Sequence, residues 1–68
     1  MRLSARNQLQ GIVTKVNKGV AIANVEIDVA GQRLVASVTV EAVEELSLVE
    51  GSAVTAVIKA SDVIIAAD

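Results

Sequence analysis

The chain contains no cysteine, histidine, proline or aromatic residue. Without histidine or cysteine it has neither a Ser-His-Asp nor a Cys-His nucleophile system. It also lacks the imidazole and thiolate groups that bind transition-metal ions. Neither a disulfide nor a structural zinc can brace the fold. These absences predict a protein that is not an enzyme and that has no transition-metal site, and only scattered carboxylates remain for Mg²⁺ or Ca²⁺.

The chain also lacks the features of a nucleic-acid or membrane protein. Without aromatic side chains no base can stack on its surface. Six basic residues face eight acidic ones, and a net charge of −2 argues against binding a phosphate backbone. No apolar run approaches the ~20 residues of a membrane span, and the polar start MRLSARNQLQ is not a signal peptide. The absence of cysteine fits a reducing compartment. We therefore expect a cytoplasmic protein with no nucleic-acid or membrane partner.

What the chain has in excess is apolar surface. Its 68 residues make one domain, spanning 1–68, and 53% of them are hydrophobic. A domain of this size buries only about 60% of the surface that its unfolded chain exposes. A core this small rarely supplies more than about 3–5 kcal/mol of stability. The composition therefore predicts an obligate oligomer, in which the chain associates with other copies of itself or with another protein.

The residue types favour β-structure, because nineteen residues are Val or Ile and three are Thr. Turn signals lie at 17–19, 30–32 and 50–52. The apolar runs between them predict strands at 8–16, 20–29, 34–40, 52–59 and 63–66, and the acidic segment EAVEEL predicts a helix at 41–46. This order predicts an all-β fold, a five-stranded OB-like Greek-key barrel with one short helix between strands 3 and 4.

The alternation of apolar residues also predicts details of two strands. In the second strand, Val20 and Ile22 have one parity, whereas Val25 and Ile27 have the other. A change of phase near Asn24 predicts a β-bulge there. In the third strand the inward face is predicted to consist of Leu34, Ala36, Val38 and Val40.

Two segments near the chain ends are rich in hydrogen-bond donors. In the first, Ser4 supplies a hydroxyl and Arg6 a guanidinium, and two side-chain amides follow at Asn7 and Gln8. The second segment, 59–61, combines an ammonium, a small residue and a hydroxyl. Each also has a plain structural interpretation, a frayed polar terminus for the first and a strand-end lysine before a turn for the second.

A third segment, Lys18-Gly19-Val20, is interpreted as a turn whose backbone N–H groups point outward, or as a simple hairpin. Together the three segments offer positive charge, hydroxyls and backbone amides. These are the groups that bind a compact oxyanion through charge-assisted hydrogen bonds. A subunit of this size has no deep pocket, so we expect such donors to converge between subunits.

Three stretches resemble the molbindins, the small molybdate-binding Mop proteins. They are SARNQLQGIV at 4–13, TVEAVEEL at 39–46 and AVIKASDVII at 56–65. The same unit is the TOBE domain of molybdate-responsive regulators and of some transport ATPases. The resemblance covers nearly the whole chain, from Met1 to Ala66, and the pairing of SARN with KAS at this separation is its most specific part.

The resemblance implies OB-like barrels that assemble as a hexamer, a trimer of dimers. It implies that molybdate, and also tungstate, binds between subunits by accepting hydrogen bonds, with no protein ligand on the metal and no further cofactor. One side of the anion would face segment 4–6 and the other would face segment 59–61 of a neighbouring subunit. Asn7 would orient the strand, and the backbone at 19–20 would serve a second kind of site. The residues so implied are Ser4, Ala5, Arg6, Asn7, Gly19, Val20, Lys59, Ala60 and Ser61.

The chain shows neither a helix-turn-helix segment nor a nucleotide-binding P-loop. We therefore expect intracellular molybdenum storage and homeostasis. The alternative is a regulatory or protein-interaction module that responds to an anion. Sulfate has the same shape but is smaller, and each hydrogen bond left unmade costs about 1–3 kcal/mol. Two such losses predict roughly hundredfold discrimination against sulfate. We expect little discrimination between molybdate and tungstate.

Overall fold

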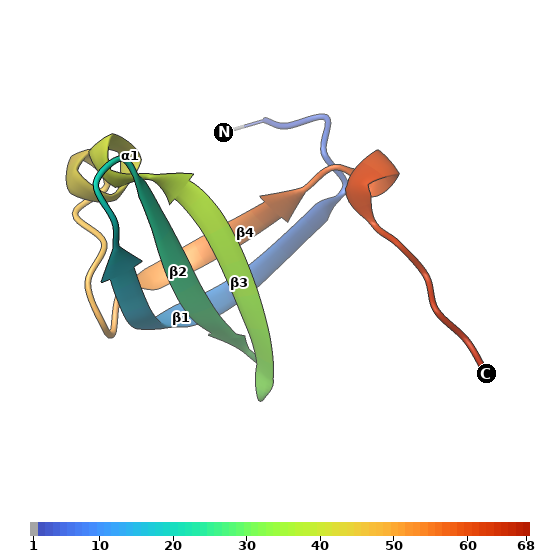
Figure 1. Cartoon of the computed structure of the whole chain (residues 1–68). Helices are drawn as coiled ribbons and strands as arrows, with labels where there is room; N and C mark the ends of the chain where they lie inside the picture. The colour runs from blue at the N-terminus through green and yellow to red at the C-terminus, as the bar shows by residue number, and fades with distance from the viewer. Residues whose placement is uncertain (1) are drawn as a thin grey trace.

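The computed structural model describes residues 2–68 and contains one antiparallel sheet with the strand order β3-β2-β1-β4 (Figure 1). The strands are β1 (Asn7–Lys18), β2 (Ile22–Val29), β3 (Gln32–Thr39) and β4 (Ala53–Ile58). Helix α1 (Val40–Glu45) connects β3 to β4, and a single 3₁₀ turn, η1 (Ala60–Asp62), follows β4. The predicted all-β fold with one short helix between the third and fourth strands is confirmed.

The predicted fifth strand at 63–66 is not confirmed, because this segment forms no strand in the chain. A strand needs a neighbouring strand to satisfy its backbone N–H and C=O groups. After η1 the chain runs away from the sheet instead (Figure 1). Ile64 and Ile65 are 93% and 87% exposed as a result. The described part of the chain therefore forms a four-stranded antiparallel sheet, and the predicted five-stranded barrel is not confirmed.

The core is small and lies between the strands and α1. Its buried residues are Val13, Ala23, Val25, Ile27 and Val43. The residues predicted to face inward from the third strand are each half-buried against this core, and so is Leu48 after the helix. The side chain of Thr39 accepts a hydrogen bond from the Ala42 N–H at 3.0 Å and so caps α1.

The predicted bulge near Asn24 is wrong. β2 pairs with β3 without interruption from Ile22 opposite Thr39 to Val29 opposite Gln32. The irregularity lies in β1 instead, between Val13 and Lys15. The prediction failed because Ile22 is apolar yet exposed, whereas the small residue Ala23 is fully buried and continues the inward face.

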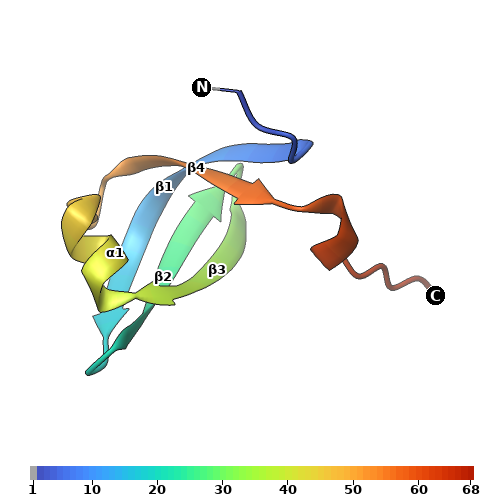
Figure 2. The ribbon, with the colours of Figure 1, turned by 90° about the horizontal axis from the view of Figure 1, so that it is seen from above.

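β1 is the long central strand, and it pairs with a different strand on each side, β2 and β4. Its first half, from Asn7 to Ile12, pairs with β4, and its second half, from Ile12 to Lys18, pairs with β2. The strand curves between these partners, as the view from above shows (Figure 2). Gly11 lies just before the change of partner, and Ile27 and Asp28 pass so close to it that a Cβ atom there would lie within 3 Å of both.

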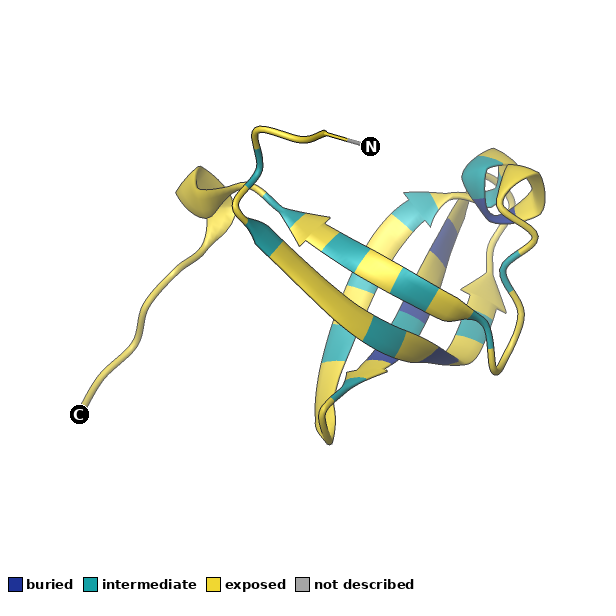
Figure 3. Cartoon of the chain, turned by 180° about the vertical axis from the view of Figure 1, so that it is seen from behind, coloured by how far each residue is buried: buried dark blue, intermediate teal, exposed yellow. Residues whose placement is uncertain are grey.

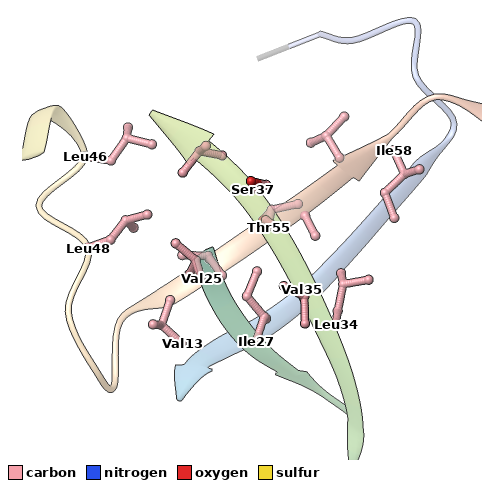
Figure 4. A pocket seen from close by; sticks show the side chains of 15 residues that line it. Val13, Val25, Ile27, Leu34, Val35, Ser37, Leu46, Leu48, Thr55 and Ile58 are labelled. Atoms are coloured by element: carbon pink, nitrogen blue, oxygen red, sulfur yellow. The ribbon is translucent and has the colours of Figure 1, made fainter. Parts of the chain in front are cut away.

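β3 and β4 lie at the two ends of the strand order and do not pair with each other. Between them lies an apolar groove of about 450 Å³, lined mainly by valine, leucine and isoleucine side chains, with Ser37 and Thr55 as its polar residues (Figure 4). Exposed and half-buried positions dominate every strand (Figure 3). Among residues 2–68, twelve large hydrophobic residues are exposed. Neither helical segment within residues 2–68 is long and apolar enough to cross a membrane.

Candidate functional site

The two donor-rich chain-end segments meet in one pocket, here called the terminal pocket. It has a volume of about 230 Å³ and is lined by Ser4, Ala5, Arg6, Lys59, Ala60 and Ser61. The sheet register explains the meeting, because Asn7 pairs with Ile58 at the end of the β1–β4 ladder. The residues just before Asn7 and just after Ile58 therefore leave the ladder side by side. Figure 1 shows both segments at the opposite end of the sheet from α1.

The terminal pocket presents hydrogen-bond donors and positive charge. Arg6 contributes a guanidinium, Lys59 an ammonium, and Ser4 and Ser61 contribute hydroxyls. No aspartate or glutamate is among its lining residues. Hydrogen bonds from charged donors to an anion are about twice as strong as neutral ones. This donor set suits a compact anion with several oxygens.

Three backbone carbonyl oxygens of the lining residues already accept hydrogen bonds. Gln8 Nε2 donates to the carbonyl of Ala5 at 3.2 Å. In η1 the carbonyls of Lys59 and Ala60 accept from backbone N–H groups at 2.9 and 3.3 Å. The carbonyl oxygens of Ala5, Lys59 and Ala60 are therefore engaged within the chain, and donors are the main side-chain groups that the pocket offers a ligand.

The size of the terminal pocket also points to a small ligand. Its volume of about 230 Å³ lies below the roughly 300–1,000 Å³ typical of sites for organic ligands. The four polar side chains that line it are exposed, so one chain forms an open cradle and not an enclosed site.

Six of the nine predicted site residues line the terminal pocket, and three do not. Asn7 lies in β1, pairs with Ile58 and is outside the lining. Gly19 and Val20 lie beyond the opposite end of β1, in the β1–β2 turn. The Gly19 N–H already donates to the carbonyl of Ile22 at 2.8 Å. Within one chain this turn therefore contributes nothing to the terminal pocket.

Val20 lines a different hollow near α1, of about 480 Å³, together with two carboxylates, Glu41 and Glu44. Its lining includes no lysine or arginine, so a single chain offers an anion no compensating charge there. The role predicted for Gly19 and Val20 depends on groups from another subunit.

Segments 4–6 and 59–61 of one chain line the same pocket. The expectation that segment 4–6 faces segment 59–61 of a neighbouring subunit stays a prediction, because the structure describes one chain. Sequence reasoning named Gln8 as a donor but did not foresee its hydrogen bond to Ala5. A glutamine three residues beyond a carbonyl in an irregular segment is a weak signal, and the contact depends on the backbone conformation.

Comparison with known proteins identifies the relatives of this chain. The TOBE domain family model matches residues 3–65. Molybdenum-pterin-binding protein 1 of Clostridium pasteurianum is 47% identical over 68 residues, which cover 98% of this chain and all of that protein.

Solved structures agree with this match. A molybdate-binding protein from Sporomusa ovata superposes with a TM-score of 0.95 at 37% identity, covering 98% of this chain and all of that one. The cytoplasmic molybdate-binding protein ModG, in a crystal form with molybdate bound, gives a TM-score of 0.90 at 46% identity. That match covers 94% of this chain and 46% of ModG. The resemblance seen in the sequence is confirmed by these comparisons.

Proposed function

The chain belongs to the TOBE domain family, and we propose that it binds molybdate in the terminal pocket. One observation carries this proposal: segments 4–6 and 59–61, 50 or more residues apart in sequence, line a single small pocket that presents donors and no carboxylate. A molybdate dianion offers four oxygens, and Arg6, Lys59, the two serines and nearby backbone amides can bind them. Relatives described as molybdate-binding support the assignment.

We propose the bare oxyanion, and not a pterin-bound form of molybdenum, as the ligand. The Clostridium relative is called molybdenum-pterin-binding, so the distinction matters. A pterin ring needs a flat apolar or aromatic surface, and this chain has no aromatic residue. The terminal pocket is also smaller than organic-ligand sites usually are.

The proposal includes a homo-oligomer, a hexamer built as a trimer of dimers. Three features support this assembly, because each leaves surface that a second copy can bury. They are the exposed apolar residues, the open groove between β3 and β4, and the uncovered terminal pocket. In such an assembly the turn at Gly19 and Val20 would contribute to a second kind of anion site between subunits. Sedimentation velocity tests the assembly, and a 7.0 kDa species at micromolar concentration would contradict it.

The proposed role is molybdenum storage and homeostasis in the cytoplasm by one domain spanning residues 1–68, with tungstate bound about as well as molybdate and with no catalysed reaction. The description of ModG as cytoplasmic supports the location. The absence of histidine and cysteine supports a binding role, since the usual nucleophile systems cannot be built.

Isothermal titration of the oligomer with molybdate tests the function. We expect saturation at one or more anions per subunit and at least tenfold weaker competition by sulfate. Arg6→Ala and Lys59→Ala should each weaken binding by about tenfold or more, because a hydrogen bond to a charged group contributes about 1.5–3 kcal/mol. Lys15→Ala is the matched control, since it removes an exposed cation from the half of β1 that pairs with β2, away from the terminal pocket.

Two results would contradict the proposal. Equal loss in Lys15→Ala and Lys59→Ala would show that general charge, and not the terminal pocket, holds the anion. Absence of any heat with molybdate and tungstate would leave a regulatory or protein-interaction module, and the search would turn to a protein partner.

A further inference from the structure

The N-terminal arm, residues 2–6, carries two donors of the terminal pocket but belongs to no helix or strand. Pairing of β1 with β4 begins only at Asn7. The arm is tied to the sheet by one side-chain hydrogen bond, in which Gln8 Nε2 donates to the carbonyl oxygen of Ala5 at 3.2 Å. Ala5 is half-buried, whereas Ser4 and Arg6 on either side of it are exposed. The direction of the two functional side chains therefore depends on how Ala5 is held.

From this geometry we propose that Gln8 is a positioning residue of the terminal pocket. The inference rests on the proposed binding of molybdate there. Gln8 does not line the pocket, so it acts through the arm. Its amide holds the backbone between Ser4 and Arg6 in the conformation that directs both side chains toward segment 59–61. It also occupies the Ala5 carbonyl, an acceptor that would otherwise repel an oxyanion.

The opposite wall of the pocket is held in a comparable way. There the 3₁₀ turn η1 occupies the Lys59 and Ala60 carbonyls with backbone N–H groups. Backbone hydrogen bonds thus fix segment 59–61, whereas segment 4–6 depends on a side chain. A single substitution can therefore loosen one wall of the pocket without disturbing the other.

The chain offers a matched control in Gln10. It is the same residue type two positions along β1, and it points to the same side of the sheet. Both glutamines are exposed and face β4 partners, Val57 for Gln8 and Thr55 for Gln10. No side-chain hydrogen bond of Gln10 occurs within residues 2–68. Substitution of Gln10 therefore reports how much molybdate affinity falls when a surface glutamine of β1 with no side-chain hydrogen bond is removed.

The test measures molybdate affinity by isothermal titration for Gln8→Ala, Gln8→Met and Gln10→Ala. Gln8→Met keeps the length of the side chain and removes the donor. We expect both Gln8 variants to bind about two- to tenfold more weakly, the range for the loss of one ordinary hydrogen bond, and Gln10→Ala to bind like wild type. The urea midpoint without anion should stay unchanged in all three, because the arm adds little to the core.

A double-mutant cycle with Arg6→Ala separates positioning from a general structural effect. If Gln8 acts by orienting the arm, Gln8→Ala should cost much less affinity in the Arg6→Ala background than in wild type. Equal fold-losses in both backgrounds would overturn the inference, and so would wild-type affinity in Gln8→Met. In either case normal binding by the wild type would leave the proposed function intact. No molybdate binding by the wild type would overturn both.

Discussion

Gly11 provides the sharpest test of how the sheet is built. A Cβ atom on Gly11 would lie 2.6 Å from Ile27 Cγ2 and 2.7 Å from the carbonyl oxygen of Asp28, with Val29 Cγ2 at 3.0 Å. The two methyl groups can shift, but the Asp28 carbonyl belongs to the β2 backbone and cannot move without disturbing that strand. Gly11→Ala therefore forces β1 and β2 apart where β1 passes from β4 to β2.

The expected loss follows from two opposing effects. Overpacking of a tight site costs about 1–3 kcal/mol. Replacing glycine by alanine recovers about 0.4–1 kcal/mol, because the unfolded chain loses conformational freedom. The net loss should be about 1–2 kcal/mol, which corresponds to a fall of roughly 4–16 °C in the melting temperature for a domain of this size.

Thermal and urea denaturation followed by circular dichroism measure this loss. All samples need one protein concentration, because the stability of an oligomer depends on it. Gly31→Asn is the control. Gly31 has φ +85° with no atom within 4 Å of its Cβ position, and asparagine tolerates left-handed backbone conformations. A Gly11→Ala protein as stable as wild type would refute the close approach of β1 and β2 at this point.

Three further predictions concern the helix cap, the surface ion pair and the pocket. Thr39→Ala should lower the free energy of unfolding by about 1 kcal/mol by removing the cap of α1, whereas Thr55→Ala, on exposed β4 surface, should change it little in the same urea titration. The hydrogen bond from Arg33 at 2.7 Å lowers the pKa of Glu26 below its usual value of 4.5. The stability from this pair is therefore present above about pH 4.5 and is lost as pH falls through the depressed pKa. The difference in urea midpoint between wild type and Glu26→Gln should accordingly shrink from pH 6 to pH 3, and a constant difference would contradict the pairing. Arg6→Lys should weaken molybdate binding less than Arg6→Ala, since it keeps the charge and loses the guanidinium fork, and equal losses in titration would show that charge contributes nothing.

Strands and turns were predictable where the turn residues and the alternation of apolar residues match the pairing found in the sheet. The turn around Gly31 and the alternation from Leu34 to Val38 each correspond to what the structure contains. The helix was expected at 41–46 and is found at Val40–Glu45. These elements depend on residues close in sequence, so composition and spacing suffice to locate them.

Predictions failed where apolar side chains are exposed, because residue type alone does not show whether such a side chain lies in the core. The run from Val63 to Ile65 has the composition of a strand, but strand formation requires a partner edge that this chain does not place beside it. The apolar Ile22 was interpreted as evidence for a change of phase near Asn24, yet it is 51% exposed and marks no inward face. In a chain that is 53% hydrophobic, apolar character no longer distinguishes core from surface.

The terminal pocket could be predicted in its residues but not in its geometry. Nothing in the spacing of segments 4–6 and 59–61 states that they meet, and their contact follows from the β1–β4 register that ends with Asn7 opposite Ile58. A register shift of one residue would turn every side chain of β4 to the other face. It would also move Lys59 along the ladder relative to Arg6. The terminal pocket is therefore a consequence of strand pairing, so a substitution that disturbs the β1–β4 ladder should reduce the proposed molybdate affinity even where every donor is retained.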